Sequence, residues 1–452
     1  MELNMFKNIA LIAFLGLALF SCKEATNNGI SNVISLDPNL CNIQNEKNQA
    51  LWGYLNEWYL WNESLDQSTD PDSFDSLQAL LDDVKGNNPI DRWSGVKETE
   101  QIQNYENGII LSFGFTAFLH EPTSELMVAQ VYKQSDAFEI GLRRGDRILE
   151  VNDISISLAI TEGRFQNGEI WGAGADNTLI TSRLQTGEIW GADADGTLIT
   201  IKWQTPEGEV FMDAMQKRLI EINTVVHRQV YETETANVGY LVFDTFSPPA
   251  EHELNSVFEY FLQQNVEQII VDLRYNGGGS SRLSSQLATQ IAGSNVQGNI
   301  FSRHFLNALH SNQNFETLFS LNGATNYLEL DQVIFLTTQY TASASEMLIN
   351  GLEPYIDVKL VGSQTHGKPA GFIGAQLCDQ TVFAVNIEVA NADNFGDYYQ
   401  GLAVDCAADD TVKTDWGKLN DPLLKEALYL LDKGQCSADG EPSIFAQKPL
   451  KH

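Results

Sequence analysis

The spacing of apolar side chains divides the chain into three stretches, and the first has a helical period. Between residues 41 and 95, aromatic and aliphatic residues from Leu51 to Trp61 recur every three or four positions, which predicts an amphipathic helix. A second helix is expected over residues 75–84. Because such an aromatic stripe usually packs into a core, we predict a small helical domain without chemistry of its own.

The second stretch has the pattern of β-strands. Strands are expected over 109–116 and 126–132, where β-branched and aromatic side chains are frequent, and a short helix is expected over 135–140. A glycine-containing turn and another apolar segment follow within 141–153. This stretch is therefore predicted to form a β-rich domain.

The third stretch, roughly residues 223–435, alternates strand and helix patterns. Strands are expected at 238–244, 268–274, 333–338 and 358–362, and helices at 251–264, 281–292 and 343–352. Strands made of continuous apolar runs, separated by amphipathic helices, are typical of an α/β core with a covered sheet.

A tandem repeat interrupts the β-rich stretch. Residues 164–182 recur as residues 183–201, with a period of 19 residues. Two copies are too few for a solenoid. Asp193 and Asp195 are similar to part of a calcium loop, but no glutamate lies at the required distance. We therefore expect an extra hairpin.

Net charge restricts the partners of the protein. The 452 residues include 27 Lys and Arg against 60 Asp and Glu, which gives a net charge of −33. Phosphate groups would be repelled, so nucleic acid and anionic membrane surfaces are not expected as partners.

The N-terminus predicts export and a lipid anchor. Residues 9–20 form an apolar run that is too short to span a bilayer but has the length of a signal-peptide core. The run ends in Leu19-Phe-Ser-Cys22, which resembles a bacterial lipobox. Cys22 is the expected lipidation site, so the only predicted membrane contact is this anchor, at the outer membrane of a bacterial cell envelope. The alternative is ordinary secretory cleavage near Ser21.

Four cysteines remain after Cys22. Outside the cytoplasm they can form two disulfides, with three possible connectivities. We expect Cys378 to pair with Cys406, and Cys41 with Cys436, which would join the two ends of the chain.

Two segments of the β-rich stretch resemble a PDZ domain. Ser112-Phe-Gly-Phe115 is similar to the carboxylate-binding loop, and Gly145-Asp-Arg-Ile-Leu-Glu-Val-Asn152 is similar to the signature strand. A glycine between apolar residues lets backbone N–H groups turn toward a terminal carboxylate. Phe113, Gly114 and Phe115 are therefore the expected peptide-carboxylate site.

A serine and a lysine carry the candidate chemistry. Ser343 lies in Thr341-Ala-Ser-Ala-Ser-Glu346 at an expected helix start, where free N–H groups and the helix dipole favour an alkoxide. The same motif has the form of a capping box, so a structural role is the alternative. Lys368 follows 25 residues later among apolar residues, which favour the neutral amine that a general base requires. His366 is the competing candidate base.

A glycine loop supplies candidate oxyanion donors. Asn276-Gly-Gly-Gly279 directly follows a predicted core strand, and glycine allows backbone N–H groups to point into a cavity. The N–H groups of Gly278, Gly279 and Ala344 are the expected donors.

These motifs together resemble the carboxyl-terminal processing peptidases, serine peptidase family S41. The resemblance implies that Ser343 is the nucleophile and Lys368 the base of an endopeptidase acting on proteins or peptides, with a PDZ domain gating access, and that no metal or organic cofactor is needed. One departure is Phe372, which stands where many members have a glutamine that orients the lysine; Gln376 is the nearest replacement. A catalytically weak or inactive peptide-binding lipoprotein is therefore the alternative function, and a scaffold that binds small apolar ligands is a further one.

The predicted fold class is an α/β protease core with an N-terminal helical segment and a PDZ-like β-rich domain. The expected organisation is a signal peptide (1–22), a tether (23–40), a helical domain (41–104), a PDZ-like domain (105–222) with the duplicated insert (164–201), the protease core (223–435) and a tail (436–452).

Overall fold

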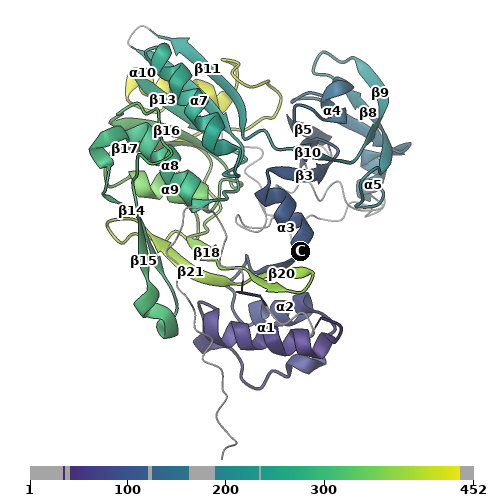
Figure 1. Cartoon of the computed structure of the whole chain (residues 1–452). Coiled ribbons are helices and arrows are strands. Elements are labelled where there is room, and N and C mark those ends of the chain that lie inside the picture. Colours follow the sequence, from purple (N-terminus) through teal and green to yellow (C-terminus); the bar gives the residue numbers. More distant parts are fainter. Residues whose placement is uncertain (1–33, 36–40, 121–124, 162–188, 234–235, 438–452) are drawn as a thin grey trace, which may run out of the picture.

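A computed structural model describes residues 34–35, 41–120, 125–161, 189–233 and 236–437 (Figure 1). In Figure 1 the helical N-terminal part lies below the α/β core, and the β-rich domain lies beside that core. The mixed architecture agrees with the predicted fold class. Within the described residues, no helix has the length and apolarity that crossing a bilayer requires. The signal peptide, Cys22 and the first copy of the 19-residue repeat lie outside them.

The helical part contains both predicted helices but does not form a core alone. Helix α1 (Gln44–Trp58) buries Leu51, and helix α2 (Leu77–Gly86) begins at Ser76, whose side chain accepts the Ala79 N–H. Their apolar faces share one cluster with strands from the C-terminal half of the chain, β19 (Ala375–Leu377) and β20 (Gln380–Phe383). Strand β2 (Gly95–Glu98) pairs with β20 and β1 (Ile34–Ser35) with β19, while helix α3 (Thr99–Glu106) follows β2.

In its described residues, the β-rich domain is a sheet with two short helices. Its strand order is β4-β5-β6-β8-β9, with the short β7 (Ile154–Ser155) paired to β6. The bounds are β4 (Phe115–His120), β5 (Glu125–Val131), β6 (Arg147–Val151), β8 (Leu198–Gln204) and β9 (Val210–Gln216), and the helices are α4 (Asp136–Glu139) and α5 (Ile156–Thr161).

The strand predicted at 109–116 is two strands, because Gly114 breaks it. Its φ is +94°, and a Cβ there would lie 2.0 Å from the Ser135 Cβ, so only glycine fits. Strand β3 (Ile109–Ser112) consequently leaves the main sheet and pairs with β10 (Arg218–Glu221).

The α/β core is built on a six-stranded sheet in the order β11-β12-β13-β16-β17-β22, parallel except for β11. The bounds are β11 (Val225–Glu232), β12 (Asn237–Phe243), β13 (Gln268–Asp272), β16 (Gln332–Thr337), β17 (Asp357–Gly362) and β22 (Cys406–Ala407). Helices α7 (Ala250–Gln263), α8 (Ser281–Ala292) and α9 (Ala344–Leu352) contribute to one apolar cluster, and α10 (Pro422–Lys433) contributes to another.

The helices and strands expected in the α/β core are therefore confirmed to within a few residues.

A second sheet has the order β15-β14-β21-β18. Its strands are β15 (Phe315–Leu318), β14 (Ile300–Phe305), β21 (Val385–Ala390) and β18 (Ala370–Phe372).

The predicted disulfide pairing is wrong. The structure joins Cys41 to Cys378, with Cα atoms 5.5 Å apart, and Cys406 to Cys436, with Cα atoms 5.4 Å apart. The helical part packs on β19 and β20, which brings Cys41 to the turn that carries Cys378. Helix α10 packs on the core sheet near β22, which brings Cys436 to Cys406.

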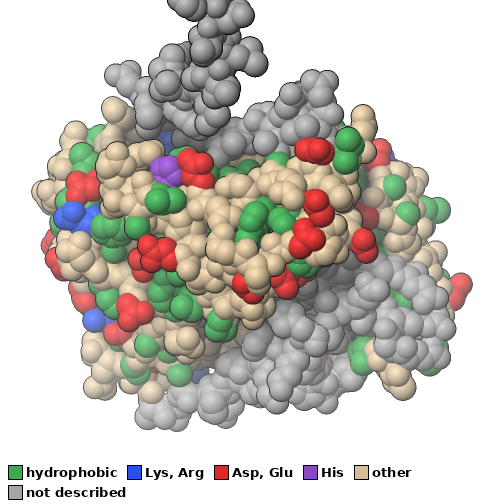
Figure 2. Space-filling model, turned by 90° about the horizontal axis from the view of Figure 1, so that it is seen from below, with side chains coloured by type: hydrophobic (Ala, Val, Ile, Leu, Met, Phe, Trp, Pro, Cys, Tyr) green, Lys and Arg blue, Asp and Glu red, His purple; other side chains and the backbone are tan. Residues whose placement is uncertain are grey.

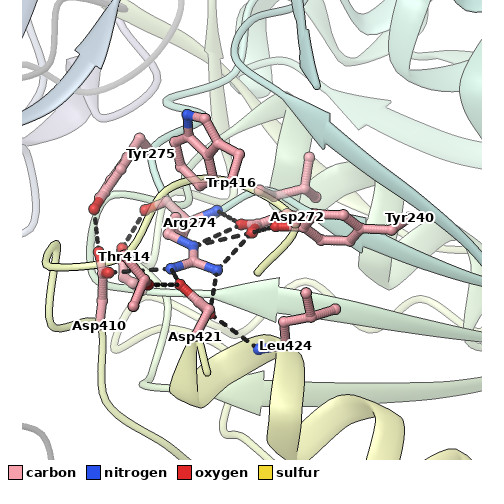
Figure 3. A network of polar contacts seen from close by, with 12 residues as sticks. Tyr240, Asp272, Arg274, Tyr275, Asp410, Thr414, Trp416, Asp421 and Leu424 are labelled. Carbon is pink, nitrogen blue, oxygen red and sulfur yellow. Dashed lines mark hydrogen bonds and ion pairs between the residues drawn. The ribbon is translucent and has the colours of Figure 1, made fainter. Parts of the chain in front are cut away.

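A buried ionic network fixes the C-terminal segment and the β-rich domain to the end of β13 (Figure 3). Arg274 is 1% exposed and donates to Asp272, to Asp410 at 3.0 Å and to Asp421 at 2.9 Å. Asp410 also accepts from Arg144 of the β-rich domain, at 3.0 Å. Two guanidinium groups thus share three carboxylates between distant parts of the chain.

We predict that Arg274→Met lowers the free energy of unfolding by about 3–5 kcal/mol, because it leaves buried carboxylates without their cation. Denaturant titration measures the change. The matched control is Arg282→Met, which removes a partly exposed ion pair with Glu251 and is expected to cost less than about 1 kcal/mol. Equal losses in the two variants would contradict a structural role for the network.

Candidate active site

Ser343 occupies a strained turn between a core strand and a helix. It follows β16 and precedes α9, with φ 54° and ψ −112°, a backbone conformation that is rare for residues other than glycine. The half-buried side chain lies at the helix N-terminus. A strand-to-helix turn of this kind is the geometry in which hydrolases present a nucleophilic serine.

Glu346 joins the Ser343 turn to the Lys368 loop. Its carboxylate accepts N–H bonds from Ser343 at 2.9 Å and Lys368 at 2.8 Å on Oε2, and bonds from Gly367 N–H and Thr365 Oγ at 2.6 Å on Oε1. One carboxylate oxygen therefore binds the backbone of both predicted catalytic residues. The prediction from sequence treated Glu346 only as half of a capping box.

These contacts also determine the ionisation of Glu346. Burial raises the pKa of this carboxyl, and its hydrogen bonds to Thr365, Lys368, Gly367 and Ser343 lower it. The Thr365 hydroxyl accepts from Leu402 N–H, so it donates its own hydrogen to Glu346. All four groups around the carboxyl are thus donors, an arrangement that only the carboxylate satisfies fully.

Lys368 is buried beside an aromatic ring. Its side chain is 1% exposed, and Nζ lies 4.0 Å from the centroid of the Phe372 ring. Phe372 occupies the position at which many members of the S41 family have a glutamine. Gln376 does not take over that position, because its Nε2 donates to the Cys378 carbonyl at 3.1 Å.

His366 is engaged elsewhere. Its Nε2 accepts from the Trp93 Nε1–H at 3.1 Å, and burial, with Arg92 and Lys368 nearby, lowers the pKa of His366 to about 4. The imidazole is neutral at physiological pH, but its acceptor nitrogen is already occupied, which favours Lys368 as the base.

The glycine loop lies against the Ser343 turn. The Asn276 carbonyl accepts from Ala342 N–H at 3.1 Å and from Ser345 Oγ at 2.9 Å. The Gly278 N–H donates to Asn276 Oδ1 at 2.8 Å, so this expected oxyanion donor is already engaged. Among the residues that the structure describes, the N–H groups of Gly279 and Ala344 have no acceptor. These two remain available to a ligand.

Two residues of the helical part reach the Lys368 loop. Trp93 binds His366, and Arg92 Nη2 donates to the carbonyls of Gly367 at 3.3 Å and Tyr399 at 2.9 Å. The helical part was predicted to have no chemistry of its own, and these contacts add a supporting role beside the Lys368 loop that the prediction did not include. Little in the sequence indicated these contacts, because Asp91-Arg-Trp-Ser94 has the composition of an ordinary loop.

The three residues predicted to bind a peptide carboxylate are all buried. Phe113 and Phe115 are buried in the core of the β-rich domain, with ring centroids 6.3 and 6.1 Å from that of Trp190, and the Gly114 N–H donates to Ser112 Oγ at 3.0 Å. Trp190 comes from the second copy of the repeat, so the described part of that copy contributes to the domain core.

The β-rich domain also contacts the surroundings of the site. The centroid of the Phe118 ring lies 4.7 Å from that of Tyr340, three residues before Ser343, and 4.9 Å from that of Tyr275, the residue before the glycine loop.

One set of metal-type ligands lies together in the described part of the chain, formed by Cys406, Glu426 and Cys436. Both sulfur atoms belong to a disulfide, so this set does not suit a metal ion.

Comparisons with known proteins agree with the architecture. A solved structure from Bacteroides fragilis, assigned to the S41 proteases, superposes with a TM-score of 0.65 at 20% identity, covering 85% of this chain and 97% of that one. Mature CPAF complexed with lactacystin gives a TM-score of 0.50 at 13% identity, covering 87% of this chain and 98% of that one. At these identities the likeness concerns the fold.

Sequence comparison gives curated relatives and family models. A Staphylococcus epidermidis protein named as a CtpA-like serine protease is 23% identical over 325 residues, 72% of this chain, and this chain spans 57% of the length of that relative. Residues 46–95 match the peptidase S41 N-terminal domain, and residues 237–406 match peptidase family S41. The two segments include both sides of the site built from Arg92, Ser343 and Lys368, and over these segments the chain belongs to peptidase family S41.

Proposed function

We propose that the protein is a serine endopeptidase with a Ser343–Lys368 dyad. The observation that carries this proposal is the shared Glu346 carboxylate, which binds the backbone N–H groups of both residues. The same carboxylate thus holds the backbone of a half-buried serine and of a buried lysine, so the hydroxyl is partly accessible to a substrate while the amine is shielded from water.

The reaction follows from these positions. The Lys368 amine takes the proton of Ser343 Oγ as this oxygen attacks the scissile carbonyl carbon, and the oxyanion accepts hydrogen bonds from Gly279 and Ala344 N–H. The Lys368 ammonium returns the proton to the departing amine, leaving an ester on Ser343. A water molecule, deprotonated by Lys368, then hydrolyses this ester and restores both side chains.

The substrates and location are part of the same proposal. Unfolded or C-terminal segments of envelope proteins are the expected substrates, and a lipid on Cys22 would hold the enzyme at the membrane. The PDZ-like domain gates access, and its contacts with Tyr340 and Tyr275 support this role, because these residues flank the nucleophile turn and the glycine loop. The widespread acidic side chains in Figure 2 disfavour acidic substrates.

We predict that Ser343→Ala and Lys368→Met each lower kcat by about 10³-fold or more, because one removes the nucleophile and the other the base. Fluorescence-monitored hydrolysis of an unfolded reporter protein measures the loss. Lys359→Met, on strand β17 with a partly exposed ion pair, is the matched control and keeps activity. Cleavage that survives in the Ser343 variant would refute the dyad. No cleavage by the folded wild-type protein would favour the peptide-binding lipoprotein.

Glu346→Gln is expected to lower the stability by about 1–3 kcal/mol, because its amide group would face a backbone N–H instead of accepting from it. The resulting displacement of the Ser343 turn or the Lys368 loop is expected to reduce kcat/KM by about 10²-fold. Denaturant titration and the same hydrolysis assay measure the two effects. Glu353→Gln, exposed at the other end of α9, is the control and changes neither. A wild-type value of kcat/KM in Glu346→Gln would contradict the proposal that this carboxylate positions the Ser343 turn and the Lys368 loop.

Cys22→Ala is expected to move the protein from the membrane fraction to the soluble fraction, since acyl chains supply the anchoring free energy. Immunodetection after fractionation measures the distribution. Cys436→Ala serves as the cysteine control, and retention of Cys22→Ala in membranes would exclude a lipid on that residue.

A further inference from the structure

The Phe372 ring lies within the range of a cation–π contact with Lys368. The Lys368 Nζ is 4.0 Å from the ring centroid, well inside the distance of about 6 Å at which the face of an aromatic ring attracts an ammonium group. Because Lys368 is 1% exposed, little water competes with the ring for this charge.

The backbone and the neighbouring rings hold Phe372 in this position. Strand β18 pairs antiparallel with β21, and the register shifts between Gly371 and Phe372, an irregularity that redirects a side chain. The ring also meets Phe383 edge to face, with centroids 5.9 Å apart, and it packs on the apolar cluster shared with the helical part. The ring is therefore a fixed wall of the lysine site.

We propose that Phe372 is a positioning residue that orients the Lys368 side chain through its ring face and favours the ammonium form of that lysine. The role rests on the proposed function of Lys368 as the general base. The Phe372 ring takes the place of a polar orienting group. As a consequence, Lys368 loses its proton at a higher pH than it would beside an aliphatic side chain.

Other titratable groups lie on the elements around the Lys368 loop, and these side chains are not altered when Phe372 is replaced. They are Glu346 on α9, His366 on the same loop, Arg92 on the loop before β2, and Glu388 on β21 opposite Ala370. A change in Lys368 titration on replacement of Phe372 alone therefore reports the ring.

The experiment is a titration of Lys368 by NMR with ¹³C-labelled lysine, in the full chain carrying Ser343→Ala, with the signal assigned by its loss in Lys368→Met. Phe372→Leu is expected to lower the titration midpoint of Lys368 by about one pH unit, whereas Phe372→Tyr keeps the ring and the midpoint. Phe372→Met, close to phenylalanine in volume, provides a second variant without a ring. The matched control is Phe315→Leu, whose exposed ring stacks on His304.

Activity supplies the second readout, measured with Ser343 intact. Phe372→Leu is expected to shift the acidic limb of the kcat–pH profile downward by the same amount and to lower the plateau by about 10-fold, because the amine is less well oriented. A midpoint in both Phe372→Leu and Phe372→Met equal to that of the parent protein would overturn the positioning role, whatever the activity. A shifted midpoint in a protein without Ser343-dependent cleavage would leave the ring–lysine contact standing, but it would overturn the Ser343–Lys368 dyad and, with it, the positioning of a general base by Phe372.

Discussion

The carboxylate of Glu346 is the contact on which the site depends. It is fully buried, and four donors from two segments of the chain converge on its two oxygens. A buried carboxylate is costly unless its hydrogen bonds are satisfied, so the Ser343 turn and the Lys368 loop are held wherever those donors fit. The unusual backbone of Ser343 persists because its own N–H is one of these donors. Strain at the serine and burial of the lysine thus have one common support.

A second buried network lies at the end of β13, next to the glycine loop. Arg274 lies two residues after the end of β13, on the segment that leads into the glycine loop. Its guanidinium binds carboxylates from β13, from the segment after β22 and from the start of α10. Arg144 shares Asp410 with it, so the β-rich domain is joined to the same cluster. Each charge of this network is paired. Replacing one member would destabilise the fold, because it would leave the other charges unpaired in a medium of low polarity.

Periodicity and local motifs predicted most of the core but not its long-range contacts. The strands at 268–272 and 332–337 and the helix at 344–352 were recognisable because each depends on nearby residues. The Ser343 turn was recognisable for the same reason. Disulfide pairing depended on which surfaces the helical part and α10 cover, and the contact of Trp93 with His366 joins positions 273 residues apart. The contact between Phe372 and Lys368 could not be predicted, because it depends on the register shift in β18, which has no local sequence pattern.

The three parts of the chain contact different sides of the site. The α/β core therefore does not form the site alone. Arg92 and Trp93 of the helical part bind the loop that carries Lys368, while Phe118 of the β-rich domain contacts residues beside the glycine loop and the Ser343 turn. A displacement of the helical part would therefore act first on the Lys368 loop, and a displacement of the β-rich domain would act first on the glycine loop and the Ser343 turn. Since Glu346 connects the Lys368 loop to the Ser343 turn, either displacement is opposed by the same buried carboxylate, and the geometry of the site reflects the packing of all three parts.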